Sequence, residues 1–237
     1  MGNSNFFRLF IVHCIVCVLL LSFFNLYAQQ NNSLEKGSWA LQFQISHNFT
    51  LSSFQGSIIS AKRHFSKKRA LRFGVSLNAS ISDIDENAAS FDSDTLQTLQ
   101  DNQSNRDFES INVTTQYLVY PTPNDRLSLF FGAGPIFGFS HNKSETERQI
   151  QNRINTTLKS IDKTNQWSLG IDMVLGSEWF IKKNISLLAE YGASLKYDWK
   201  KTTKTTITED RATATKSKIN SINLNANSVK FGLSIYF

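Results

Sequence analysis

Apolar and polar side chains alternate with a period of two along most of the chain after about residue 37. In residues 167–182, the odd positions are apolar apart from one serine, and the even positions include Gly170, Asp172 and Glu178. Such alternation is typical of β-strands that have one apolar face. No amphipathic helical period dominates, so the pattern predicts an all-β chain.

The alternating segments predict eight strands. They cover roughly residues 38–49, 54–65, 70–83, 109–121, 127–141, 166–182, 184–199 and 220–237. The parity of the apolar positions changes near Asn227, which a one-residue β-bulge would explain. The connections at 66–69, 122–126 and 182–184 are short, whereas those at 84–108, 142–165 and 200–219 are long and polar. We therefore expect an antiparallel sheet with a short-turn end and a long-loop end, the brief connection near 49–53 being the exception.

A soluble barrel also alternates, but with its apolar face turned inward. Several predicted strands reach fourteen residues or more, which exceeds the usual soluble strand and suffices to cross a bilayer. Aromatic residues lie toward the ends of the apolar face, as at Trp39, Trp179 and Trp199, whereas the polar face is rich in Gly and Ser. These features favour a closed barrel in lipid, where every backbone polar group needs an internal partner.

Residues 1–28 have the pattern of a cleaved secretory signal peptide, with Arg8 before an apolar run and Ala28 at the expected cleavage point. An uncleaved membrane anchor is the alternative. Both cysteines, Cys14 and Cys17, lie inside this segment, so the predicted mature chain has no disulfide or cysteine-ligated metal. We expect a short periplasmic segment at 29–36 and one barrel domain at 37–237.

The end of the chain resembles the Gram-negative outer-membrane β-barrel family. Its last strand alternates through Phe231, Leu233 and Ile235 to a terminal Phe237, and in that family such a strand is recognised by the assembly machinery. The signal peptide, the lack of mature cysteine and the segment Gly132–Pro135 resemble the same family. The nearest type is the small eight-stranded OmpX-like or OmpA-membrane-domain-like barrel. The resemblance implies short periplasmic turns, long extracellular loops, an outer-membrane location and an assembly signal at these four residues.

A barrel of eight strands is just wide enough for side chains to fill it. The expected polar network of the interior comprises Arg72, Asp172, Glu178, Glu190, Lys196, Asp198 and Lys230. Gln42, Gln44, Asn112 and Gln116 share its face. Because both signs of charge are present, we expect a paired, hydrogen-bonded plug. A narrow ion-conducting, porin-like path is the alternative.

Interaction chemistry is expected on the long connections. Residues 83–109 are acidic, although their spacing fits no EF-hand loop. Residues 200–218 are rich in Lys and Thr, and form either a solvated loop or a contact for lipopolysaccharide phosphates. Residues 142–165 carry apolar side chains at helical spacing, which is compatible with a short helix or a loose loop. The basic turn at 62–69 is expected at the level of the lipid headgroups.

The sequence shows no catalytic motif, cofactor motif or metal-ligand motif. A lipid A hydrolase or acyltransferase remains the enzymatic alternative, with His47, His141 and Ser140 as its candidates, although Ser140 faces away from His141. The leading interpretation is an outer-membrane protein with a structural or interaction role. Its expected partners are outer-membrane lipids, including lipopolysaccharide, and the barrel assembly machinery during biogenesis. Nucleic acid is not expected as a partner, and a monomer is expected.

Overall fold

The computed structural model describes residues 34–50, 55–91, 97–124, 126–151, 156–208 and 211–237. The predicted signal peptide at 1–28 lies outside the described residues, as does most of the segment at 29–36. Within the described ranges all regular structure is β-strand, and no helix there is long and apolar enough to cross a membrane.

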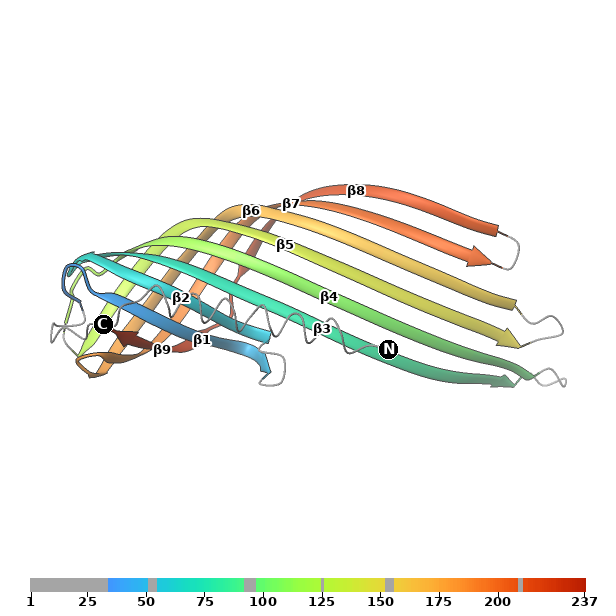
Figure 1. The fold of residues 1–237 in the computed structure, drawn as a ribbon, viewed down its shortest axis with the longest axis horizontal. Coiled ribbons are helices and arrows are strands. Elements are labelled where there is room, and N and C mark those ends of the chain that lie inside the picture. The colour runs from blue at the N-terminus through green and yellow to red at the C-terminus, as the bar shows by residue number, and fades with distance from the viewer. Residues whose placement is uncertain (1–33, 51–54, 92–96, 125, 152–155, 209–210) are drawn as a thin grey trace.

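Nine antiparallel strands follow one another along the chain (Figure 1). They are β1 (Trp39–Thr50), β2 (Gln55–Ser66), β3 (Arg69–Phe91), β4 (Gln97–Val119), β5 (Leu127–Gln151), β6 (Thr156–Lys182), β7 (Ile185–Thr208), β8 (Arg211–Ala226) and β9 (Lys230–Tyr236). The predicted eighth strand is thus divided into β8 and β9. The break falls at residues 227–229, where the parity of apolar positions changes in the sequence.

The sheet closes into a ring of eight strand positions. Its order is β6-β5-β4-β3-β2-β1-β9-β7, and a further pairing of β6 with β7 completes the circle. β8 occupies the same position as β9, because both pair with β7 at different heights. Closure at the last strand is direct: Ala40 in β1 pairs with Tyr236 in β9, and Ile185 in β7 pairs with Ile235. The predicted eight-stranded antiparallel barrel is confirmed.

Six of the strands continue well beyond the closed ring, and this extension corrects the sequence prediction of long loops. The segments 84–108, 142–165 and 200–219 are mostly paired strand, as in the unbroken β3–β4 register from Arg69↔Val119 to Phe91↔Gln97. The helix considered for 142–165 is wrong, because the described residues there belong to β5 and β6. We call this extension the outer sheet, formed by the distal parts of β3–β8 (Figure 1). The short turns lie at the opposite end, as predicted.

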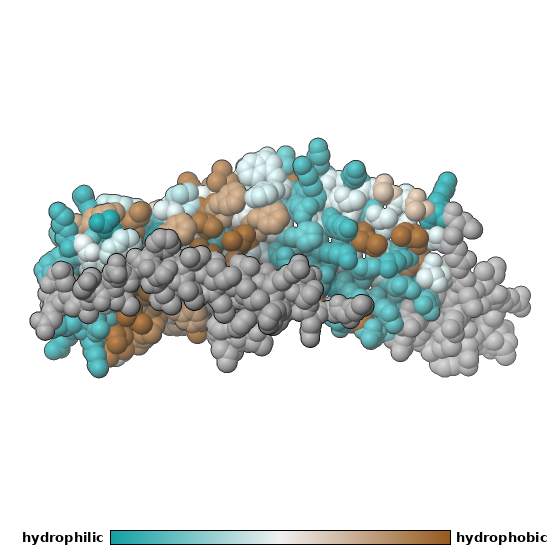
Figure 2. All heavy atoms as spheres, viewed as in Figure 1, coloured by the Kyte–Doolittle hydropathy of each residue, from teal (hydrophilic) through white to brown (hydrophobic). Residues whose placement is uncertain are grey.

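The distribution of apolar side chains is inverted relative to a soluble protein. Leu175 is 62% exposed, Phe231 60% and Trp167 48%, whereas the buried set includes Lys62 and Glu178 at 0%. Figure 2 shows hydrophobic residues gathered over the barrel end and hydrophilic residues dominating the outer sheet. The apolar stripe of each strand therefore faces outward, and the polar stripe faces the barrel axis.

Candidate functional site: the barrel interior and the outer sheet

A fully buried cluster around Glu178 fills the barrel near its short turns. Lys62 in β2 donates to Glu178 Oε2 at 2.8 Å and also reaches the hydroxyl of Tyr120 at 3.0 Å. Glu178 accepts three further hydrogen bonds, from Tyr120 at 3.1 Å, Ser186 at 2.6 Å and Tyr236 at 2.7 Å. A buried ion pair persists only when such additional bonds satisfy its oxygens. Five strand positions therefore meet at one carboxylate.

A second layer lies further along the axis toward the outer sheet. Arg72 in β3 forms a two-pronged ion pair with Glu190 in β7, with Nη1 at 2.7 Å and Nη2 at 3.3 Å from the two carboxylate oxygens. Its Nε donates to Gln116 at 2.8 Å, and the Gln116 amide donates to Asp172 at 2.6 Å. Asn227 donates to the other Asp172 oxygen at 3.1 Å. This layer joins β3, β4, β6 and β7 across the barrel.

The structure places the seven polar residues expected in the interior at three levels. Glu178 belongs to the cluster near the turns, and Arg72, Asp172 and Glu190 form the second layer. Asp198 lies further out, where Asn223 donates to it. Lys196 and Lys230 line a cavity of about 150 Å³ next to the second layer. Of the flanking amides, Gln42 bonds Ser234 at 2.9 Å and Asn112 bonds Ser76 at 3.4 Å.

Sequence reasoning missed several members of the cluster near the turns. Lys62 and His64 were expected at the lipid headgroups as part of the basic turn, but both side chains are fully buried. The alternation along β2 could have indicated their positions. Arg63 and Phe65 face outward, so Lys62 and His64, at the alternate positions, face inward. Tyr120 and Tyr236 were also missed, although they share the even parity of the inward residues in β4 and β9.

The outward face has an apolar band bounded by aromatic residues. At the outer end one row joins Ile111, Phe139, Trp167 and Trp199 across β4–β7. At the turn end the band closes with Trp179 and with Trp39, whose ring lies 5.3 Å from the Arg63 guanidinium. Twelve residues separate Trp167 from Trp179, which is roughly 40 Å along a strand and roughly 30 Å across a bilayer at the tilt of a small barrel. The band therefore matches the thickness of the hydrocarbon core.

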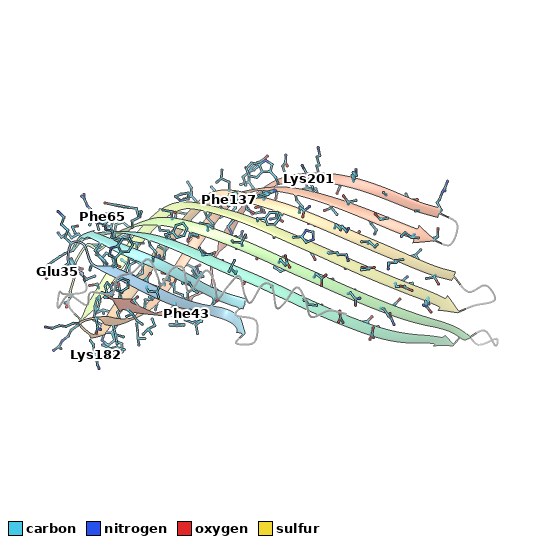
Figure 3. All side chains as sticks on the ribbon, viewed as in Figure 1. Glu35, Phe43, Phe65, Phe137, Lys182 and Lys201 are labelled. Carbon is cyan, nitrogen blue, oxygen red and sulfur yellow. The ribbon has the colours of Figure 1, made fainter. Side chains whose placement is uncertain are left out.

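Charged residues begin in the next outward row. Glu109, His141, Asn165 and Lys201 are paired in register directly beyond the aromatic row. Figure 3 places Lys201 where the outer sheet begins and Lys182 at the opposite, short-turn end. This abrupt change from aromatic to charged side chains marks the boundary between lipid and water.

The two edge strands of the outer sheet carry opposite charges. β3 pairs with β2 only as far as Val75, and β8 pairs with β7 alone among the described strands. Acidic residues follow the β3 edge, and basic residues follow the β8 edge. The acidic set is Asp83, Asp85 and Glu86; the basic set is Arg211, Lys216 and Lys218. Each edge presents a row of backbone N–H and C=O groups without a neighbouring strand.

The enzymatic candidates are only partly brought together. His141 Nδ1 lies 2.6 Å from Asn165 Oδ1, and Glu109 is in register with His141 on the same outward face. Glu109 is not among the enzymatic candidates that the sequence suggests. Ser140 faces the barrel interior, because its register partners Ser110 and Gln166 lie on the inward parity. The side chain of His47 lies outside the described residues.

The terminal residues with the alternating pattern lie on β9. Phe231, Leu233 and Ile235 are all exposed outward, at the same height as their β1 partners. The backbone of Phe237 exchanges hydrogen bonds with Trp39, at 2.9 and 3.0 Å. The last strand is therefore part of the closed wall up to its final residue.

No protein-family model matches the sequence, and a search of curated proteins also gives no match. Solved structures with a related arrangement include the attachment invasion locus protein Ail of Yersinia pestis, at 12% identity and a TM-score of 0.37, covering 85% of this chain and 99% of Ail. CarO of Acinetobacter baumannii is 12% identical, with a TM-score of 0.37, and the match covers 87% of this chain and 100% of CarO. A major outer membrane protein of Thermus thermophilus is 10% identical, with a TM-score of 0.32, and the match covers 85% of this chain and 99% of that protein.

The geometry of this chain itself decides its environment. Among the described residues, the closed part of the ring runs from the short turns to the β7–β9 pair Glu190↔Lys230 and leaves no strand edge unpaired, which is what a spanning sheet needs in hydrocarbon. The band faces outward, has aromatic borders and encloses a polar interior. A soluble barrel would place these residues the other way round. The chain is therefore a membrane-spanning β-barrel of eight strand positions.

Proposed function

We propose that this protein anchors an interaction surface outside the cell, and that the surface is the outer sheet. The observation that carries the proposal is the pair of open strand edges, β3 and β8, above the membrane band. A protein strand that adds to such an edge gains main-chain hydrogen bonds, and the side chains along the edge select it. The partner is therefore an extended segment of another extracellular protein.

The charges of the two edges specify the partner further. An acidic segment complements β8, where Lys216 and Lys218 point to the outward face, and the neighbouring β7 adds Lys200, Lys201 and Lys204. A basic segment complements the β3 edge. Electrostatic complementarity of this kind raises the association rate and fixes the register of the added strand.

The barrel serves as the anchor and not as an open pore in this proposal. The Glu178 cluster and the Arg72 layer cross the interior at two heights, and both are tied by hydrogen bonds to opposite walls. An interior of this strand number leaves little room once side chains fill it. The lipid contacts of the anchor include lipopolysaccharide, whose phosphates meet the basic outward residues Lys143, Lys163 and Lys201 just above the aromatic row.

Peptide binding to the refolded protein in detergent tests the proposal. We expect a fluorescent ten-residue peptide of alternating Thr and Glu to bind with saturation in a polarisation assay. Binding weakens with added salt, since the charges lie on an exposed surface. The double variant Lys216→Glu/Lys218→Glu should weaken binding at least tenfold.

Matched controls separate strand addition from general charge attraction. The variant Lys163→Glu changes a basic residue in the centre of the outer sheet, on β6, and should bind the peptide as the unchanged protein does. A peptide of the same length and net charge with proline at every third position cannot form the ladder and should not bind. Equal binding of the proline peptide, or no saturable binding, would contradict the proposal.

A further inference from the structure

A polar cavity of about 150 Å³ lies inside the barrel on the outer-sheet side of the Arg72 layer. Its floor includes Arg72 and Glu190, and its lining extends to Ser76, Asn112 and Lys196, which lie further toward the outer sheet on their strands. Nearly every strand position of the ring contributes to the wall. A cavity of this size holds several water molecules, each about 30 Å³ in the liquid, and therefore also a small ion with its oxygens.

The cavity has more positive than negative side chains. Three cations line it, Arg72, Lys196 and Lys230, against two carboxylates, Asp172 and Glu190. Both carboxylates are already held: Glu190 by Arg72, and Asp172 by Gln116 and Asn227. Among the described residues, neither Lys196 nor Lys230 forms an ion pair within 4.0 Å. The cavity thus has two ammonium groups without an ion pair within 4.0 Å in the described residues, of which Lys230 lies opposite the already paired Glu190 in the β7–β9 register.

Further donors face the same space. Arg72 uses three of its five N–H groups on Gln116 and Glu190, which leaves two for a ligand. The hydroxyl of Ser60 is buried, with the residue 2% exposed, and has no hydrogen-bond partner within the part of the chain that the structure describes. A buried hydroxyl without a partner is costly, and a bound acceptor would remove that cost.

We infer that this cavity binds a small oxyanion, such as phosphate or a short carboxylate. The oxyanion oxygens accept from Lys196, Lys230 and Ser60, and from the free N–H groups of Arg72. Charge-assisted bonds from several donors are the strong class of hydrogen bond. This inference does not depend on the outer sheet or on any partner of it.

The experiment uses the predicted mature chain, residues 29–237, refolded in detergent without oxyanion buffers, with inorganic phosphate as the probe. We expect saturable binding by ³¹P NMR line broadening and a phosphate-dependent rise in the urea midpoint of unfolding, because a ligand of the folded state stabilises it. Lys196→Met should raise the dissociation constant at least tenfold, and Lys182→Met, at an exposed short turn, should not change it. Parallel titrations with acetate and chloride distinguish a carboxylate preference from a phosphate preference and from general salt effects.

The outcomes are decisive in both directions. Saturable binding of phosphate or acetate, lost in Lys196→Met, supports the inference. The inference is overturned if neither ion binds with saturation, if chloride binds equally well, or if Lys196→Met binds phosphate unchanged. Should Lys196→Met fail to show the heat-dependent gel mobility of a folded barrel, Ser60→Ala takes its place with the same expected direction.

Discussion

At the scale of single residues, polar groups buried in pairs hold the barrel interior together. Glu178 is the best example, since its two oxygens accept from Lys62, Tyr120, Ser186 and Tyr236. Removing one member of a buried pair leaves the other charge uncompensated, which costs more than the pair itself contributes. The interior therefore responds to single and double substitutions in different ways.

Glu178→Gln is expected to destabilise the barrel by about 3–5 kcal/mol, because it leaves the Lys62 ammonium buried without a counter-charge. Lys62→Met combined with Glu178→Gln should recover most of that loss, since the glutamine oxygen still accepts from Tyr236 and its NH2 group can donate to the hydroxyl of Tyr120. Urea unfolding in lipid vesicles measures both. Lys182→Met, at an exposed turn, is the control. A double variant as unstable as Glu178→Gln alone would show that the pair is not the cause.

On the outer sheet, the pKa of Glu145 lies below its ordinary value because Lys159 and Lys143 donate hydrogen bonds to it. A lowered pKa means that the carboxylate stabilises the sheet above the ordinary pKa of glutamate, and that this contribution is lost as the pH falls through the lowered pKa. The side chains are partly exposed, so salt weakens the effect. A ¹³C NMR titration should show a higher Glu145 pKa in Lys159→Met; an unchanged value would exclude this pairing.

At the scale of elements, alternation in sequence predicts strands only where their two faces meet different environments. Inside the membrane band, one face meets lipid and the other meets the polar interior, so the period of two is clear, as at residues 167–182. The outer sheet has water on both sides, and its strands, such as β8, are polar on both faces. These strands pair because the register set inside the barrel continues outward without a break. A single sequence does not reveal that register.

The same reasoning explains the residues missed in the interior. Lys62 stands in a basic run that resembles a solvated turn, and only the positions of its β2 neighbours place it inward. The cavity and the pairing of particular charges, such as Arg72 with Glu190, depend on contacts between strands 118 residues apart. The odd or even position of a residue in its strand predicts which way its side chain faces, but it does not predict which residue the side chain will contact.

Inward glycines set how closely the strands of the wall pack. A Cβ on Gly170 would collide with the backbone carbonyl of Leu195 and lie 2.8 Å from the Cα of Lys196. Gly170→Val should therefore lower the free energy of unfolding by about 1–3 kcal/mol, because the added side chain overpacks the contact with β7. Leu169→Val, on the outward face next to it, should cost less. Urea unfolding of the two variants compares them, and equal losses would argue against tight packing at this position.

The β7–β8 part of the outer sheet is expected to be dispensable for insertion. Replacing residues 202–217 by Asn-Gly joins Lys201 and Lys218, which already pair across β7 and β8, through a two-residue hairpin turn. The shortened protein should still insert and show heat-dependent gel mobility, while losing the acidic-peptide binding. Failure to insert would mean that the outer sheet belongs to the barrel's folding unit and not to a separate surface.

At the scale of the whole molecule, the two interior layers should block ion flow. We expect a planar bilayer containing the protein to show no steady conductance, because ion pairs tied to opposite walls fill the path. A steady conductance that changes in Glu190→Gln would favour the porin-like alternative. The control is the same preparation after heat denaturation, which removes any signal from the folded barrel.

The membrane-spanning arrangement requires that the apolar outer face of the barrel lies in lipid. Ile171 lies in the middle of the band and is 53% exposed. With the four native tryptophans replaced by Phe, Ile171→Trp places one fluorophore there. Vesicles whose lipids carry bromine atoms at the middle of their acyl chains should strongly quench its fluorescence relative to unbrominated vesicles. Equal fluorescence in both would mean that Ile171 packs against protein, and would contradict the membrane-spanning arrangement.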